Sequence, residues 1–344
     1  MKTKNLIVLL LIGLLPGLNI QSFAQNSPAA PFLGRWALTL DYEEENAGWL
    51  EVRQEDGYLD SDMLWRSGSV EPVDYTLVNE NQLILVRGRD VVRKRDEDRN
   101  PVRTTHPVNW FQLTATGEDL LEGRVYYPHS NGIGVEEVRF TGKKIPALGE
   151  APNRRKVKYG EPLELFNGKN LQGWELLNKE KTSGWNVVDG ILVNNPLQTR
   201  GEKQIRYGNL RTTETFEDFN LKVEVSVPAG SNGGIYLRGI YEIQVLDSYG
   251  KDLDPHNMGA LYSRITPSVA AEKPSGEWQD LDITLYKRYL TVVLNGKKII
   301  DNQPVKGITG GAITSNEFIP GPLLLQGDHG KVSYRKIVLT PILN

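Results

Sequence analysis

The chain has 344 residues, of which 40 are lysine or arginine and 43 are aspartate or glutamate, so its formal net charge is −3. This near balance excludes the strongly basic surface on which nucleic-acid binding depends. The hydrophobic fraction of 39% excludes a disordered chain, and the length predicts two globular domains. Because the sequence has no cysteine, disulfides, thiol nucleophiles and a lipid-modified cysteine are excluded as well.

The first 24 residues have the order of a secretory signal peptide. Lys2 and Lys4 precede an apolar run over residues 6–18, and Ser22-Phe23-Ala24 supplies the small residues of a cleavage site. The apolar run is shorter than the roughly 20 residues that a helix needs to span a bilayer. We therefore predict cleavage after Ala24 and export to the periplasm, without a membrane span.

Residues 31–145 form the first predicted domain. Short runs of alternating apolar and polar residues are separated by turn sequences such as Glu55-Asp56-Gly57, which is typical of antiparallel strands. The predicted strands cover residues 33–41, 48–54, 57–66, 70–78, 82–88, 107–115, 119–127 and 135–143. Eight such strands in succession predict a small antiparallel barrel or sandwich, and the charged segment 90–103 predicts a solvated hairpin tip. This domain could bind glycan, cap an active site or mediate dimerisation.

A basic, proline-containing linker over residues 146–162 leads to the second predicted domain, residues 163–344. Its predicted strands cover residues 220–227, 234–238, 241–246, 279–285, 290–294, 323–326 and 332–339. Asn295-Gly296 is a strong hairpin signal between two of the runs. No segment shows a sustained helical period, so the predicted fold class is all-β.

The most informative candidate site lies on the strand predicted over residues 241–246. On a strand, Glu242 and Gln244 point to one face while Ile243 and Val245 point to the other. A one-residue bulge after Val245 would bring Asp247 to the face of the two polar residues. Arg238 would then lie on the neighbouring strand, so three polar groups and a cation would share one concave sheet surface.

Further candidates lie in loops near strand ends. His256 is in Asp254-Pro255-His256-Asn257, Tyr262 follows shortly after it, and Gln326 and His329 belong to Gln326-Gly327-Asp328-His329-Gly330. Loops rich in glycine and aspartate carry functional residues more often than core strands do. Ser/His/Asp arrangements and phosphate-binding loops are absent from the sequence.

Several of these motifs occur in the same order in a known family. The second domain resembles the 3-keto-disaccharide hydrolases over about residues 163–342, and the first domain is not covered. The motifs that carry the resemblance are residues 165–174, 185–192, 232–238, 241–247, 259–262, 276–278, 294–296 and 321–330. The resemblance implies a concanavalin A-like jelly-roll β-sandwich related to the laminarinase-type glycanases.

Those glycanases carry their paired carboxylates on a strand of the form E-x-D-x-x-E. The matching positions here are Glu242, Gln244 and Asp247, so an amide replaces the middle carboxylate. A retaining glycosidase needs two carboxyl groups about 5–5.5 Å apart. The changed triad therefore puts ordinary glycoside hydrolysis in doubt, although Glu242 and Asp247 could in principle serve as the pair.

The resemblance implies a different chemistry, in which a sugar oxidised at C3 loses its C2 proton, expels the C1 substituent and then adds water. This chemistry assigns Glu242 or His256 as the base and Arg238 as the stabiliser of the enolate, with a divalent metal as an alternative electrophile. The sugar pocket and proton transfer are assigned to Gln244, Asp247, Tyr262, Gln326 and His329. A separate sugar oxidoreductase would supply the keto group. The alternatives are a non-catalytic, lectin-like carbohydrate-binding protein and a conventional retaining glycanase.

Overall fold

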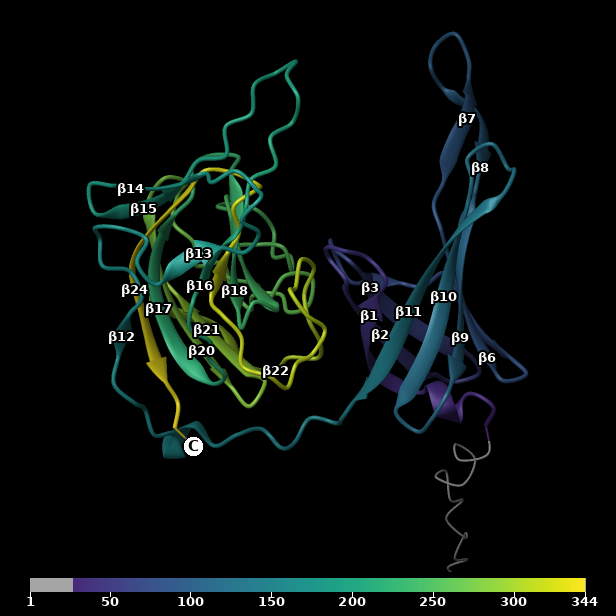
Figure 1. The fold of residues 1–344 in the computed structure, drawn as a ribbon, viewed down its shortest axis with the longest axis horizontal. Coiled ribbons are helices and arrows are strands. Elements are labelled where there is room, and N and C mark those ends of the chain that lie inside the picture. Colours follow the sequence, from purple (N-terminus) through teal and green to yellow (C-terminus); the bar gives the residue numbers. More distant parts are fainter. Residues whose placement is uncertain (1–26, 344) are drawn as a thin grey trace, which may run out of the picture.

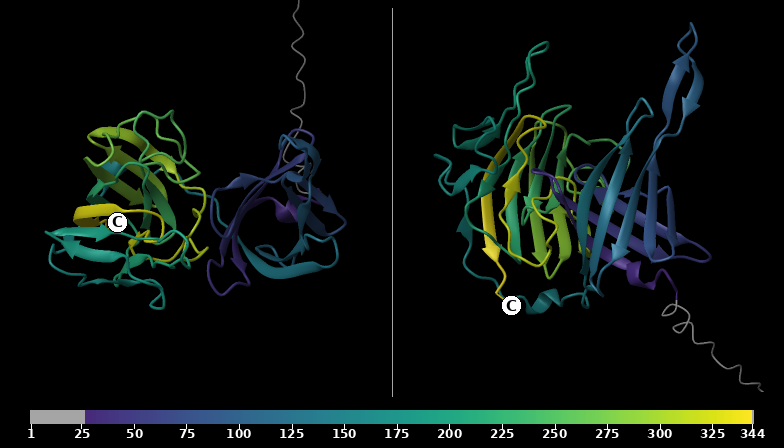
Figure 2. Two further views of the ribbon diagram at one scale, coloured as in Figure 1. Left: turned by 90° about the horizontal axis from the view of Figure 1, so that it is seen from above. Right: turned by 45° about the vertical axis from the view of Figure 1, so that its right-hand side comes forward.

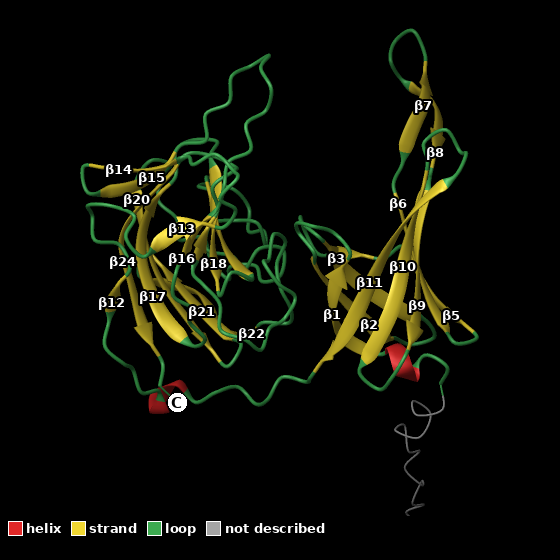
Figure 3. Ribbon diagram, in the orientation of Figure 1, coloured by secondary structure: helices red, strands yellow, loops and turns green. Residues whose placement is uncertain are grey.

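The computed structural model describes residues 27–343, which form two β-rich halves (Figure 1). The predicted signal peptide over residues 1–24 lies outside the described residues. Within residues 27–343, helical structure is limited to the short 3₁₀ turns η1 (Ala30–Phe32) and η2 (Arg154–Lys156), shown in red in Figure 3. None of the helices described is long or apolar enough to cross a membrane. The all-β class predicted from the sequence is confirmed.

The first half is a nine-stranded antiparallel sheet that curls into a barrel, seen end-on in the left view of Figure 2. The strands are β1 (Gly34–Leu40), β2 (Ala47–Gln54), β3 (Leu59–Trp65), β4 (Glu71–Pro72), β5 (Tyr75–Asn79), β6 (Gln82–Gly88), β9 (Val108–Ala115), β10 (Leu120–Pro128) and β11 (Val135–Ile145). Their order, β4-β3-β2-β1-β11-β10-β9-β6-β5, keeps most sequence neighbours adjacent, as in a meander. Inward-facing side chains such as Trp36, Leu38 and Leu113 fill the barrel.

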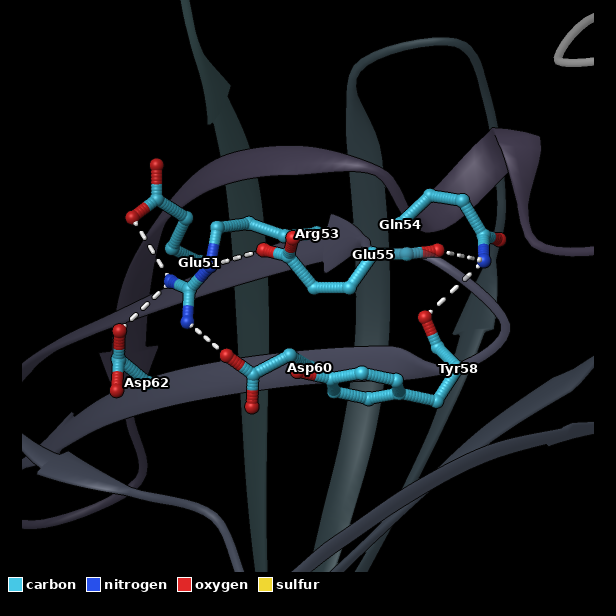
Figure 4. A network of polar contacts seen from close by, with 7 residues as sticks. All are labelled: Glu51, Arg53, Gln54, Glu55, Tyr58, Asp60 and Asp62. Carbon is cyan, nitrogen blue, oxygen red and sulfur yellow. Dashed lines mark hydrogen bonds and ion pairs between the residues drawn. The ribbon is translucent and has the colours of Figure 1, made fainter.

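A cross-strand network on the barrel surface ties β2 to β3. The guanidinium of Arg53 forms ion pairs with Glu51, Asp60 and Asp62, the last at 2.6 Å (Figure 4). The side chains involved are about one-third exposed, so water screens much of their attraction. The network therefore contributes more to the register of this strand pair than to net stability.

One detail of the barrel differs from the sequence-based prediction, and another agrees with it. The strand predicted over 70–78 is split into β4 and β5, because the chain changes its partner strand between them: β4 pairs with β3, and β5 pairs with β6. The charged segment 90–103, predicted as a solvated hairpin tip, is confirmed as an exposed hairpin. It is formed by β7 (Val91–Arg95) and β8 (Pro101–Thr105), whose pairing contains register shifts, and it extends away from the barrel (Figure 1).

The second half is a sandwich of two antiparallel sheets. One sheet has the order β14-β15-β24-β17-β20-β21-β22, with β12 paired to β24, and the other has the order β13-β16-β23-β18-β19. The strands are β12 (Leu163–Glu164), β13 (Trp174–Leu176), β14 (Trp185–Val188), β15 (Ile191–Asn194), β16 (Leu210–Thr212), β17 (Phe219–Ser226), β18 (Asn232–Leu237), β19 (Tyr241–Leu246), β20 (Trp278–Tyr286), β21 (Tyr289–Leu294), β22 (Lys297–Pro304), β23 (Leu324–Leu325) and β24 (Val332–Pro341). The short strands between residues 163 and 212 were not predicted, because runs of two to four residues are too short for a period to show.

The core of this sandwich comes from the inward faces of both sheets. Leu221, Val223 and Val225 of β17 alternate with more exposed residues, and they pack in one cluster with Ile235 and Ile243 of the opposite sheet. The outward face of β18 and β19 is therefore left free to carry polar side chains.

The two halves share part of one hydrophobic core. Ala47 and Trp49 of β2 and Leu64 of β3 are buried in the cluster that also contains the core of the sandwich. The Arg264 guanidinium lies 4.3 Å from the centre of the Trp49 ring. The barrel is thus packed against the sandwich, and the linker is not the only connection between them.

Candidate active site

The candidate site lies on β18 and β19, which pair so that Gly234 is opposite Gln244 and Tyr236 is opposite Glu242. The side chains of Glu242 and Gln244 line a cavity, whereas Ile243 and Val245 belong to the core of the sandwich. The predicted alternation along this strand is therefore confirmed. A Cβ on Gly234 would lie 2.3 Å from Oε1 of Glu242, so the glycine gives the carboxyl group the space that it occupies.

The cavity has a volume of about 760 Å³ and is lined by both halves of the chain. The sandwich contributes Asn209, Asn232, Tyr236, Glu242, Gln244, Tyr262, Gln326, Asp328 and His329, together with residues of the segments 177–181 and 310–313. The barrel contributes Glu43, Glu44, Glu45, Asn46, Ser67 and Gly68. The volume is within the range of about 300–1,000 Å³ that is usual for pockets enclosing small organic ligands.

Glu242 is a buried carboxyl group with an exposed fraction of 3%. Burial raises its pKa to about 8, because the charged form loses its hydration; the hydrogen bond with Tyr236 and the charge of His329 act in the opposite direction. Its backbone N–H donates to Oγ1 of Thr309 at 2.9 Å, which fixes the strand beneath it. A carboxyl group with such a pKa exchanges protons close to neutral pH.

The hydrogen bonds of Tyr236 are compatible with either protonation state of Glu242. The Tyr236 hydroxyl lies 2.9 Å from Oε2 of Glu242 and also 2.9 Å from the carbonyl oxygen of Gly310. A hydroxyl has a single hydrogen, and a carbonyl can only accept. If Tyr236 donates to Gly310, Glu242 must be protonated to donate to the Tyr236 oxygen. When Glu242 ionises, the Tyr236 hydrogen turns toward the carboxylate.

A histidine–aspartate pair lies at the same cavity. Nδ1 of His329 is 2.7 Å from Oδ1 of Asp328, and this hydrogen bond raises the pKa of His329. The same bond lowers the pKa of Asp328 against the opposing effect of burial. A protonated His329 retains one further N–H, at Nε2, that is available to a ligand.

Three amide oxygens of the cavity lining are buried and have no hydrogen-bond partner within the described part of the chain. They are Oε1 of Gln244, Oε1 of Gln326 and Oδ1 of Asn232. An unpaired buried acceptor costs about 1–3 kcal/mol, so such groups point to a bound ligand or to water. Acceptors gathered beside a carboxyl group suit a ligand that carries several hydroxyl groups.

Of the eight residues predicted for the site, Glu242, Gln244, Tyr262, Gln326 and His329 line the cavity, and three do not. Arg238 is buried, and its guanidinium donates to the carbonyl groups of Glu317, at 2.8 Å, and of Ile319. The sequence predicts Arg238 on a strand, but β18 ends at Leu237 and Arg238 begins the β18–β19 turn with a positive φ of 55°. Its side chain therefore does not point to the face of the sheet that the strand period predicts.

The other two residues outside the cavity are Asp247 and His256. Strand β19 ends at Leu246, and Asp247 accepts a hydrogen bond from the Gly230 N–H at 2.9 Å instead of joining the face of Glu242. The His256 ring lies beside Tyr262, with ring centres 4.8 Å apart, but it is bonded to Asp254 at 2.6 Å and to Ser69 of the barrel at 2.9 Å.

Sequence reasoning missed Tyr236, Asp328, Asn232 and the barrel residues of the cavity. Tyr236 and Asn232 could have been found, because a two-residue period places them on one face of β18. The barrel residues left no local signal, since their proximity depends on packing between domains. Within residues 27–343, no cluster of three or more histidine, aspartate or glutamate side chains is arranged to hold a metal ion.

The fold and the site together define an all-β protein whose sandwich half carries a polar, partly enclosed cavity around a buried carboxyl group. Residues 161–340 match the family model described as the 3-keto-alpha-glucoside-1,2-lyase-like domain, which covers more than half of the chain. The chain belongs to this family. The family predicted from the sequence motifs is thereby confirmed for the second half, and the barrel lies outside the match.

Individual relatives are more distant. The chain is 27% identical over 167 residues to a 3-keto-disaccharide hydrolase of Bacteroides thetaiotaomicron, which covers 40% of this chain and 57% of that protein. The match thus spans little more than half the length of this curated relative. Two solved structures of candidate glycosyl hydrolases from Parabacteroides distasonis are also similar. They are 21% and 26% identical, cover 53% and 56% of this chain and 94% and 93% of their own, and give TM-scores of 0.44 and 0.43.

The raised pKa of Glu242 predicts a pH-dependent stability difference. The folded chain binds the Glu242 proton up to about pH 8, whereas the unfolded chain releases it near pH 4.5. The stability of the wild type should therefore fall as the pH rises from 4.5 to 8, by about 3–5 kcal/mol from this group. Glu242→Gln keeps the shape of the side chain but does not titrate. In urea unfolding, the free energy of unfolding of the variant should therefore rise relative to that of the wild type between pH 4.5 and pH 8. A difference that does not change with pH would contradict the assignment.

Proposed function

We propose that this protein cleaves 3-keto-glycosides by proton abstraction at C2, elimination of the C1 substituent and addition of water. The observation that carries the proposal is the buried Glu242, with a pKa of about 8, in the lining of a cavity that also contains unpaired amide oxygens able to accept from hydroxyl groups. The family and the Bacteroides relative, both named for 3-keto sugars, supply the substrate class.

The chemistry depends on the ketone at C3. It makes the C2 proton acidic, because the carbanion left behind is an enolate. The C2 proton goes to the Glu242 carboxylate, and the electron pair expels the oxygen on C1, which leaves as an alcohol after taking a proton. Water then adds at C1 of the unsaturated ketone, and a proton returns to C2. The sum of these steps is hydrolysis of the glycosidic bond.

Glu242 has the properties that a base for this step requires. Its raised pKa makes the carboxylate a stronger base than an exposed glutamate, and general base catalysis works best when the pKa is close to the working pH. Tyr236 stabilises the ionised form by turning its hydroxyl from Gly310 to the carboxylate. Abstraction of a weakly acidic C–H proton therefore fits this residue better than nucleophilic attack does.

The remaining roles fall to other side chains of the cavity. His329, whose pKa is raised by its hydrogen bond with Asp328, is the acid for the leaving oxygen. The amide N–H groups of Gln244 and Gln326 are donors available to the enolate oxygen, and their unpaired oxygens accept from sugar hydroxyls. The role predicted for Arg238 passes to these amides, because its guanidinium is bound to loop carbonyls.

The proposal includes a separate sugar oxidoreductase. The reaction needs a ketone that ordinary glycosides lack, so an oxidation at C3 must precede cleavage. We propose that an enzyme of that class acts on the glycoside before this protein binds it.

An aryl 3-keto-glucoside and its unoxidised parent provide the direct test. The wild type should release the phenol from the keto substrate alone, and Glu242→Gln should lower kcat by about 10²–10⁴-fold, the usual contribution of a general base. Glu97→Gln, at the exposed tip of the β7–β8 hairpin, is a matched control and should keep full activity.

Two results would contradict the proposed function. Release of phenol from the unoxidised parent would mean an ordinary glycosidase. Measurable glycan binding without cleavage of either compound would mean a carbohydrate-binding protein.

We also propose that the protein is exported, with a mature chain that begins at Gln25. The support is the charge, apolar run and small residues of the first 24 positions. N-terminal sequencing of the protein from the periplasmic fraction of cells that express the full chain should read Gln-Asn-Ser-Pro. A start at Met1 together with recovery in the cytoplasm would contradict export.

A further inference from the structure

The cavity has two walls that come from different halves of the chain. The inner wall, on β18, β19 and the segment after β23, carries Glu242, Gln244 and His329. The outer wall consists of the barrel residues 43–46 and 67–68, and the sandwich segment 177–181 completes it. The barrel lies outside the family match, so this outer wall is particular to the two-domain arrangement.

The outer wall is held in place by close backbone packing between the halves. A Cβ added to Gly310 would lie 2.1 Å from the carbonyl oxygen of Gly68, and one added to Gly307 would lie 2.3 Å from the Trp49 ring. Any side chain at these two sandwich positions would overlap the barrel, so only glycine allows the barrel residues to pack this closely. Gly310, which packs against Gly68, is also the residue whose carbonyl oxygen accepts from the Tyr236 hydroxyl.

Polar bonds join the two halves of the chain near the cavity. Oε1 of Glu44 accepts from the Asn178 amide at 2.6 Å, and its other carboxylate oxygen lies 3.4 Å from the ammonium of Lys181. On the opposite side, Oγ of Ser263 accepts from the Val70 N–H at 2.7 Å. These bonds connect the barrel to the sandwich, so they hold the barrel residues in position in the cavity wall.

We propose that the barrel forms the leaving-group subsite of the cavity, built for a hydroxylated leaving group such as a second sugar. This inference rests on the proposed function. The 3-keto ring must place its C2 proton at Glu242 and its C1 oxygen near His329, so it occupies the inner wall. The leaving group, attached at C1, then extends toward the outer wall.

The chemistry of the outer wall indicates the class of leaving group. Its barrel residues are three glutamates, an asparagine, a serine and a glycine, with no aromatic ring among them. Glu44 is engaged by Asn178 and Lys181, and Glu45 by Arg66. Glu43 and Asn46 are the remaining acceptors for ligand hydroxyls. A flat apolar aglycone would gain little from such a wall, whereas a sugar can donate several hydrogen bonds to it.

Selectivity between two substrates tests this inference. The readout is the ratio of kcat/KM for a 3-keto-disaccharide to kcat/KM for phenyl 3-keto-glucoside. The double variant Glu43→Ala/Asn46→Ala removes acceptors from the outer wall and should lower this ratio at least about tenfold, as expected when bonds to a hydroxylated group are lost. The matched double variant Glu97→Ala/Asn100→Ala, on the β7–β8 hairpin, should leave the ratio unchanged.

If the outer-wall variant keeps the wild-type ratio, whether because neither kcat/KM changes or because both fall equally, the result would contradict the subsite. The affinity for the unoxidised disaccharide, measured by calorimetry, does not depend on turnover. It therefore tests the subsite separately from the proposed function. Affinity about tenfold weaker in the outer-wall variant than in the hairpin variant would support the subsite even if no keto sugar is cleaved. Equal affinities would overturn it, whatever the turnover.

Discussion

The site depends on a carboxyl group that is buried but not paired with a cation. Glu242 lies on an outward face of the sandwich, yet the barrel and the segments around it leave only 3% of it exposed. Within residues 27–343 no ion pair joins Glu242 to a cation, so burial favours the neutral form. The Tyr236 hydroxyl fits that form, because it can donate to the Gly310 carbonyl and accept from Glu242. The same three groups can support the ionised form after one hydroxyl rotation. A proton can therefore be held and released with little rearrangement, as an elimination reaction requires.

The barrel contributes to the site because it helps to bury Glu242. Trp49 and Leu64 give it a share in the sandwich core, and the Gly68–Gly310 contact places it next to the carbonyl that binds Tyr236. Of the three roles that the sequence left open for the first domain, covering the active site agrees best with these contacts. The linker covers the distance between the two halves, whereas the packed core sets their arrangement.

Much of the fold followed from the sequence, because alternation with a period of two is a local property. It predicted the all-β class, most barrel strands, and Glu242 and Gln244 on one face of β19. It did not predict where a strand ends: Arg238 lies in a turn and Asp247 lies beyond the end of β19, so both left the expected face. Contacts such as Ser69 with His256 join residues far apart in the chain, and no period or motif encodes them.

The central claim is that Glu242 removes the C2 proton, and the fate of that position in heavy water tests it most directly. Turnover of a 3-keto-glycoside in D₂O should give a product with one deuterium at C2, detected by mass spectrometry and NMR. Unreacted substrate incubated with Glu242→Gln should gain no deuterium at that position above the rate without enzyme. A product that keeps its original C2 hydrogen, formed with no kinetic isotope effect when that hydrogen is replaced by deuterium, would show direct displacement at C1 and would contradict the account.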